Sequence, residues 1–266
     1  MESPQAFYRE AGTGPGVLCL HSNAASSSQW RALMDKLAPG FHVIACDGYG
    51  AGKSPPWPGD RRIGLREEAA LAEPLIARAG EPVALVAHSY GAAVALVAAV
   101  LNPGRIRAMA LYEPTLFALV DAHTPPPNEA DGIRDAVARS QRALDAGDAD
   151  EAARVFIDFW MGDGAWAHTP DARKGSIRES IANVSNWGRA LLGEDTPLQA
   201  FAQLKMPVLY MTGGRSPAPS LAVARLLAKA LPQVQVLEFE ALGHMGPVTH
   251  PDIVNDAIER FLVATR

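Results

Sequence analysis

The stretch Ala87-His88-Ser89-Tyr90-Gly91 joins an apolar run at 83–87 to an alanine-rich run that begins at Gly91. Small residues two positions before and after a serine let a strand and a helix close into a tight turn that raises the serine hydroxyl. Such a pattern arises by chance in alanine-rich chains, but the continuously apolar run before it is typical of a buried parallel strand. We therefore interpret residues 87–91 as a nucleophile elbow with Ser89 at its tip.

Outward from this turn, apolar strand patterns alternate with helical patterns, which predicts an α/β fold with a mostly parallel twisted sheet flanked by helices. The predicted strands are 5–9, 17–20, 42–46, 83–87, 108–112, 208–212 and 234–239, and the predicted helices are 28–37, 65–79, 91–101, 220–231 and 252–264. Pro74 is expected to kink or bend the second helix. The short loop 12–16 predicts an antiparallel hairpin between the first two strands, so that the sheet is mixed at one edge.

More than ninety residues separate the strand ending near Tyr112 from the strand starting near Pro207. This length exceeds what a crossover requires. Helical patterns at 131–146, 148–161 and 170–187 predict an inserted helical lid over 117–200, with the α/β core formed by 1–116 and 201–266. Asp148 and Glu151 have capping-box spacing. The lid holds the aromatic residues Phe156, Phe159, Trp160, Trp166 and Trp187. We expect roughly one in three of them to line a pocket and the others to form lid core.

Composition excludes several classes of protein. The 266 residues carry a formal charge of −5 without a basic run, which argues against a nucleic-acid partner. No apolar stretch is long enough for a membrane span, and the N-terminal residues lack a signal-peptide pattern, so we expect a cytoplasmic protein. The two cysteines, Cys19 and Cys46, lie in apolar strand-like runs, where reduced buried thiols are expected.

Four landmarks together resemble the α/β-hydrolase superfamily of lidded serine hydrolases, over nearly the whole chain. They are His21-Ser22-Asn23, Asp47-Gly48-Tyr49-Gly50-Ala51-Gly52-Lys53-Ser54, the turn around Ser89, and Gly243-His244-Met245-Gly246-Pro247. The second landmark ends like a phosphate-binding loop, but Asp47 stands where that loop needs glycine, so we expect Asp47 to cap backbone N–H groups of a structural turn.

The resemblance implies roles for several residues. His244 is expected to act as the general base for Ser89, and the backbone N–H groups of Asn23 and Tyr90 are expected to form the oxyanion hole. His21 is expected to be structural. The residues expected to contact the substrate are Ser22, Trp160, Trp187 and Met245.

The acidic residue of the triad does not stand at the position that the family usually uses. The family usually places it in a Gly-x-x-Asp turn, where this chain has Gly213-Gly214-Arg215-Ser216. A serine cannot neutralise an imidazolium. Some members carry the acid after the preceding strand, where this chain has Glu113, and the following proline should favour extended geometry there. We therefore assign Glu113, with Glu240 and then Asp121 as alternatives.

These inferences predict a serine hydrolase that cleaves a small or medium apolar ester, or a related acyl bond, through an acyl-enzyme with a Ser-His-Glu triad. Neither a metal nor an organic cofactor is required, and the partner is a small-molecule substrate. Two alternatives stay open: a C–C lyase or cofactor-free peroxidase on the same fold, and a non-catalytic ligand-binding homologue. The sequence carries no signal for the oligomeric state.

Overall fold

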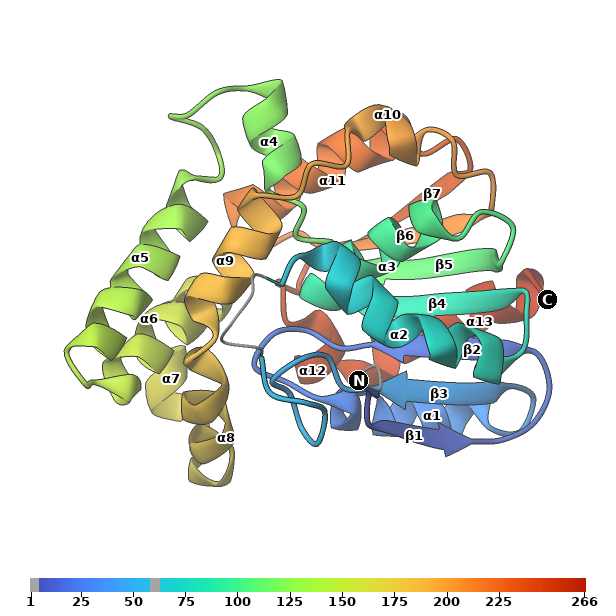
Figure 1. The fold of residues 1–266 in the computed structure, drawn as a ribbon, viewed down its shortest axis with the longest axis horizontal. Helices are drawn as coiled ribbons and strands as arrows, with labels where there is room; N and C mark the ends of the chain where they lie inside the picture. Colours follow the sequence, from blue (N-terminus) through green and yellow to red (C-terminus); the bar gives the residue numbers. More distant parts are fainter. Residues whose placement is uncertain (1–4, 58–62) are drawn as a thin grey trace.

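A seven-stranded sheet forms the centre of the computed structural model, which describes residues 5–57 and 63–266. The spatial order is β1-β3-β2-β4-β5-β6-β7, and only β1 is antiparallel to its neighbour (Figure 1). The strands are β1 (Tyr8–Ala11), β2 (Gly16–Leu20), β3 (His42–Cys46), β4 (Val83–His88), β5 (Ile106–Tyr112), β6 (Val208–Gly213) and β7 (Val234–Phe239). Residues 1–4, part of the N-terminal stretch considered above, lie outside the described residues.

The prediction of a β1–β2 hairpin is wrong. β1 pairs with β3 instead, with Tyr8 opposite Cys46 and Ala11 opposite Val43. β2 has no free edge, because β3 and β4 occupy its two sides. Two strand spacings amount to about 10 Å, a distance that the short loop after Ala11 spans. The prediction that the sheet is mixed at one edge is confirmed.

Helices cover both faces of the sheet. Alternate residues of β2 separate into two clusters: Leu18 and Leu20 pack toward α2 and α3, whereas Val17 and Cys19 pack toward α1 and α13. The core helices are η1 (Ser27–Trp30), α1 (Arg31–Leu37), α2 (Leu65–Ala79), α3 (Tyr90–Leu101), α11 (Ala218–Ala230), α12 (Gly246–Thr249) and α13 (Pro251–Ala264). α2 is continuous through Pro74. Cys19 and Cys46 are free and buried, as predicted.

The insertion between β5 and β6 is helical, and most of it lies beyond the carboxyl ends of the parallel strands (Figure 1). Its helices are α4 (Ala118–His123), α5 (Asp131–Asp145), α6 (Ala149–Met161), α7 (Ala165–His168), α8 (Asp171–Ile181), α9 (Val184–Leu192) and α10 (Leu198–Phe201). The predicted helix 170–187 is in fact two helices, which separate at Ala182 and Asn183. α4, α7 and α10 were not predicted, since one or two turns carry little periodicity.

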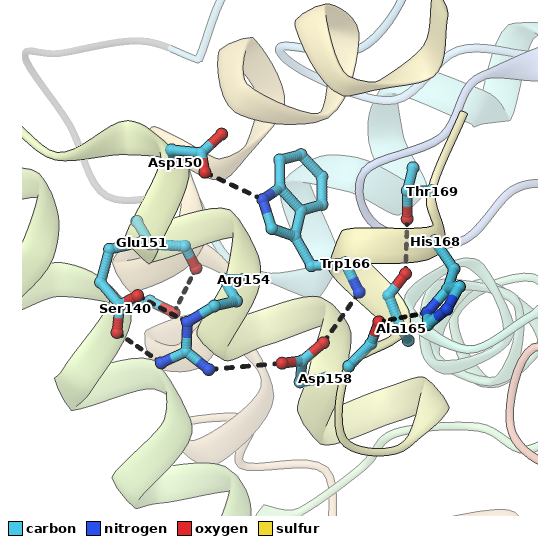
Figure 2. A network of polar contacts seen from close by, with 11 residues as sticks. Ser140, Asp150, Glu151, Arg154, Asp158, Ala165, Trp166, His168 and Thr169 are labelled. Carbon is cyan, nitrogen blue, oxygen red and sulfur yellow. Dashed lines mark hydrogen bonds and ion pairs between the residues drawn. The ribbon is translucent and has the colours of Figure 1, made fainter. Parts of the chain in front are cut away.

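Polar contacts hold α6 and α7 together (Figure 2). The backbone N–H of Trp166 donates to Asp158 Oδ1 (2.8 Å), and its indole Nε1–H donates to Asp150 Oδ2 (3.1 Å). Arg154 donates to both carboxylate oxygens of Glu151 (2.6 Å each) and to Asp158 (3.3 Å). Trp166 is thereby fixed inside the insertion, as expected of a lid-core residue.

The N-terminus of α6 confirms one half of the expected capping box, because Asp148 accepts a hydrogen bond from the backbone N–H of Glu151 (2.9 Å). Within the described parts of the chain, none of the helices has the length and apolar character needed to cross a membrane.

The elbow depends on the absence of a side chain at Gly91. A Cβ there would lie 2.5 Å from the carbonyl oxygen of His21 and 2.6 Å from that of Leu20, and both are backbone atoms of the neighbouring strand end. We expect Gly91→Ala to lower the free energy of unfolding by about 1–3 kcal/mol through overpacking. For a domain of this size, thermal unfolding should shift down by several degrees, by about 2–4 °C per kcal/mol.

Gly175→Ala is the matched control. Gly175 lies in α8, is exposed, and has open space where its Cβ would be. Because alanine favours helix over glycine by about 1 kcal/mol, this variant should be unchanged or more stable. Equal melting temperatures for the two variants would contradict the tight-approach interpretation.

Candidate active site

Ser89 occupies the turn between β4 and α3 in a backbone conformation that non-glycine residues rarely adopt. Its φ is 57° and its ψ is −117°, and its backbone N–H donates to the carbonyl oxygen of Tyr112 at 2.9 Å. Strain of this kind persists only where the surroundings fix it. The conformation agrees with the elbow predicted from the sequence.

Three predicted side chains come together at the carboxyl edge of the sheet. Ser89 Oγ lies 2.9 Å from His244 Nε2, and His244 Nδ1 lies 2.6 Å from Glu113 Oε2. With the ring proton on Nδ1, the imidazole donates to the carboxylate and accepts from the serine hydroxyl. This is the geometry of a serine nucleophile, a base and an orienting acid.

The carboxylate of Glu113 is fully buried and surrounded by donors. Besides His244, its Oε1 accepts from Gly213 N (2.7 Å), Ser216 Oγ (2.6 Å) and Thr212 Oγ1 (3.0 Å). Burial acts to raise the pKa of Glu113, but the hydrogen bond and charge of His244, with the Gly213 and Ser216 bonds, outweigh it and hold that pKa below its ordinary value. The group is therefore maintained as an anion.

The backbone at Glu113 differs from the prediction. The proline after it was expected to favour extended geometry, but the φ of Glu113 is 45°, in the left-handed region. In this conformation its side chain accepts the four hydrogen bonds described above. Among the described residues, the positive-φ non-glycine positions are Ala24, Ser89 and Glu113, and Ala24 follows the Ser22-Asn23 turn. Backbone strain is thus concentrated at this site.

The alternative acids are placed elsewhere. Glu240 is exposed, and Asp121 pairs with Arg134 and accepts from Asn128. Ser216, at the position where the resemblance would place an aspartate, donates its hydroxyl to Glu113. The hydroxyl of Ser216 therefore binds the Glu113 carboxylate from the position where the resemblance would place an aspartate.

The loop that carries His244 is fixed from two sides. The Tyr112 hydroxyl donates to the carbonyl oxygen of Gly243 (2.8 Å), and a Cβ on Gly246 would lie 2.3 Å from that hydroxyl oxygen. The indole of Trp160, from the insertion, stacks on the imidazole with ring centroids 4.0 Å apart. Trp160 was expected to contact substrate, and it also stacks on the imidazole of His244.

A polar chain that sequence reasoning missed runs behind the site. Ser22 donates its N–H (3.1 Å) and hydroxyl (3.0 Å) to Gln29 Oε1, and Gln29 Nε2 donates to His88 Nδ1 (3.1 Å). His88 Nε2 in turn donates to the carbonyl oxygen of His244 (2.8 Å). Burial lowers the pKa of His88 well below its ordinary value, so the ring is neutral. The position of His88 next to Ser89 was the one sequence feature that could have indicated its role. The sequence around Gln29 carried no such feature.

A cavity lined by Ser89 and His244 contains about 490 Å³ of space not filled by protein atoms, part of it open to solvent. The predicted contact residues Ser22, Trp160, Trp187 and Met245 all line it, together with Asn23. Its other lining residues are Thr115, Phe117, Ile133, Val137, Phe156, Val184, Gly188, Leu191 and Leu192. Three of the five lid aromatics line it, more than the third expected, and Phe159 and Trp166 do not.

Two further predictions concern the turns around the site. Asp47 accepts backbone N–H groups of Ser27 (2.6 Å) and Lys53 (2.9 Å), which confirms its capping role. His21 accepts from the backbone N–H of Gly48 (3.0 Å) and donates to the carbonyl oxygen of Ser22 (2.7 Å), as a structural histidine does. The described residues contain no cluster of three or more His, Cys, Asp or Glu side chains that could hold a metal ion.

Known proteins that are similar to this chain in sequence or structure share this fold. A family model described as alpha/beta hydrolase fold matches residues 15–251. Pimeloyl-(acyl-carrier protein) methyl ester esterase of Xanthomonas campestris pv. campestris is 26% identical, with 95% of this chain and 97% of that protein covered. Lipase LipV of Mycobacterium tuberculosis is 28% identical, with 91% and 92% covered. The crystal structure of an alpha/beta hydrolase from Sphaerobacter thermophilus superposes with a TM-score of 0.75, at 26% identity, with 97% and 96% covered.

The donors to Glu113 predict a pH-dependent effect on stability. Because the folded-state pKa lies below the ordinary value of about 4.3, these interactions stabilise the protein above that pH, and the stabilisation is lost as pH falls through the folded-state pKa. We expect Ser216→Ala to lower the free energy of unfolding by about 2 kcal/mol at neutral pH, and by less in acid. Urea unfolding of Ser216→Ala and of the wild type, at neutral pH and in acid, measures the difference between their free energies of unfolding under each condition.

Ser176→Ala is the control, since Ser176 is an exposed residue of α8. It should change stability by less than about 0.5 kcal/mol at either pH. A Ser216→Ala effect that does not depend on pH would contradict the interaction with an ionised carboxylate.

Proposed function

The chain belongs to the alpha/beta hydrolase fold family and is an enzyme of that fold, and from this premise we propose that it is a serine hydrolase that cleaves small or medium apolar esters. The observation that carries the proposal is the continuous hydrogen-bonded chain from Ser89 through His244 to the buried carboxylate of Glu113. The esterase and lipase names of the relatives support the ester class.

The proposed reaction has two steps. Ser89 Oγ attacks the ester carbonyl carbon while its proton passes to His244 Nε2, and the same proton then goes to the alcohol that leaves. His244 next takes a proton from water, whose oxygen attacks the acyl carbon. As the bond between that carbon and Ser89 Oγ breaks, His244 returns the proton to Ser89 Oγ, and the carboxylic acid is released. Glu113 keeps the proton of His244 on Nδ1 and stabilises the imidazolium that forms.

We assign the oxyanion hole to the backbone N–H groups of Asn23 and Tyr90. Tyr90 follows Ser89 directly at the start of α3, and Asn23 lines the same cavity as Ser89 and His244. A donor pair of this type stabilises the negative charge that develops on the carbonyl oxygen, and the loss of one donor costs about 3 kcal/mol in comparable sites.

The side chains that line the cavity support an apolar substrate. Phe117, Phe156, Trp160 and Trp187 supply aromatic surface, and aliphatic side chains of α5 and α9 complete the wall. The side chains of Trp160 and Trp187 are positioned to contact the substrate from the insertion, and those of Ser22 and Met245 from the core. Burial of apolar groups against this wall would provide most of the binding free energy.

Hydrolysis of p-nitrophenyl butyrate tests the proposal. We expect the wild type to turn over the ester, Ser89→Ala to lose about 10⁵-fold in kcat, and Glu113→Gln to lose about 10⁴-fold, because the amide cannot stabilise the imidazolium. Glu240→Gln should keep wild-type activity, since Glu240 is exposed and the described hydrogen-bond partners of the His244 ring are Ser89, Glu113 and Ser220. Activity that survives in Ser89→Ala would contradict the proposal, and so would an inactive wild type.

The chain Ser22–Gln29–His88–His244 predicts a positioning effect. Gln29→Ala leaves His88 Nδ1 and the N–H of Ser22 without their partner, so the turn that carries Asn23 and the loop that carries His244 lose a common support. We expect kcat for the same ester to fall about tenfold or more, with little change in KM.

Gln203→Ala, at an exposed position, serves as the control for this effect. Thermal unfolding of both variants should be recorded beside the kinetics. A rise in KM at constant kcat for Gln29→Ala would contradict a role in positioning.

A further inference from the structure

A second cavity adjoins the first and is not used by the proposed reaction. It contains about 530 Å³ of empty space and shares Asn23 and Trp187 with the first cavity. Tyr90 and Gly91 of the elbow line it, whereas Ser89 and His244 do not. Most of its wall is apolar, with contributions from Leu20, Cys46, Leu71, Ala72 and Val94. The cavity therefore lies next to the proposed oxyanion hole, and His244 is not part of its wall.

Glu68 of α2 lines this cavity and has too few partners for a buried carboxylate. The residue is 4% exposed, and among residues 5–57 and 63–266 its donors are the N–H of Tyr49 (3.2 Å) and the hydroxyl of Tyr90 (3.3 Å). An ionised carboxylate accepts about four hydrogen bonds, as Glu113 does here at 2.6–3.0 Å. Burial raises the pKa of Glu68 to about 7, against the effect of the two bonds.

The charges around Glu68 favour a ligand that donates hydrogen bonds to its carboxylate. Neither Lys nor Arg occurs among the lining residues that the structure describes. The titratable groups that face the cavity are Asp47, Tyr49 and Tyr90, together with His21 and Cys46. Burial lowers the pKa of His21 and raises those of Tyr90 and Cys46, so these three are uncharged near neutral pH. No described cation in the wall neutralises the carboxyl group, and a cationic ligand would.

We propose that this second cavity binds an alkyl chain that ends in an ammonium group, with Glu68 as its counter-ion. The apolar wall takes the chain, and the carboxylate accepts N–H bonds at the free lone pairs. The inference rests on the proposed ester hydrolysis for the part of the ligand that enters, while the binding site itself does not depend on turnover.

The position of His244 indicates which part of the substrate enters. The base must reach the leaving oxygen, so the alcohol lies in the first cavity beside His244. The second cavity contacts the residues assigned to the oxyanion hole but not the base, and is therefore placed for the acyl chain. Esters of ω-amino acids are the substrate class that this arrangement favours.

Two esters of equal shape test the proposal. The p-nitrophenyl esters of 6-aminohexanoic and heptanoic acid differ only by ammonium in place of methyl at the chain end. We expect the wild type to have a kcat/KM for the amino ester about tenfold higher or more, and Glu68→Gln to bring the ratio to about one. Glu67→Gln, one residue away and exposed, is the control and should keep the wild-type ratio.

Calorimetric titration with hexylammonium and with 1-hexanol tests the site without turnover. Wild type and Ser89→Ala should both bind the amine more tightly than the alcohol. Binding of the cation requires the ionised carboxyl, so the affinity of the wild type for hexylammonium should rise between about pH 6 and 8 and then level off. This pH dependence is measured on unaltered protein and does not require that Glu68→Gln folds.

The outcomes separate the two proposals. Hexylammonium binding that depends on Glu68, without ester hydrolysis, would overturn the proposed function and keep this site. Hydrolysis of both esters with the same ratio in wild type and Glu68→Gln would overturn the site and keep the function. Equal affinity for amine and alcohol, or no dependence on pH, would also overturn the site.

Discussion

The hydrogen bond between Glu113 and His244 is the interaction on which the other features of the site depend. A carboxylate without solvent exposure is tolerated only if its lone pairs are satisfied. The chain meets this requirement with donors from the end of β6 and the turn after it, and with the imidazole of the loop after β7. Because these segments follow adjacent parallel strands, their relative positions are set by the register of the sheet.

The same rigid edge explains where the backbone is strained. Ser89 and Glu113 follow the neighbouring strands β4 and β5, and both have positive φ. A conformation of this type costs about 1–3 kcal/mol at each residue and persists only if tertiary packing holds it. The strands, buried on both faces, provide that support. The strain directs the serine hydroxyl and the carboxylate toward the imidazole.

The sequence predicted the features that follow from local pattern. The apolar residues of these strands and the turns that bound them delimited β3 and β7 to the residue, and the turns after strands pointed to Ser89 and His244. The pairing of β1 with β3 depends on which strand edge is free, and that is not a local property. The break between α8 and α9 and the contact between Gln29 and His88 likewise depend on tertiary packing. Glu113 was predicted by position, whereas its left-handed backbone was not, because the local preference before proline is for extended geometry.

Two buried glutamates differ in the number and length of the hydrogen bonds that their surroundings provide. Glu113 has four short donors and a lowered pKa, while Glu68 has two long ones and a raised pKa. Tyr90 links the two regions, because its hydroxyl contacts Glu68 and its backbone begins the helix after Ser89. A carboxyl group that is left short of donors on a cavity wall is costly for folding. The ligand proposed for the second cavity would supply the missing donor at Glu68, whereas the protein itself supplies the donors at Glu113.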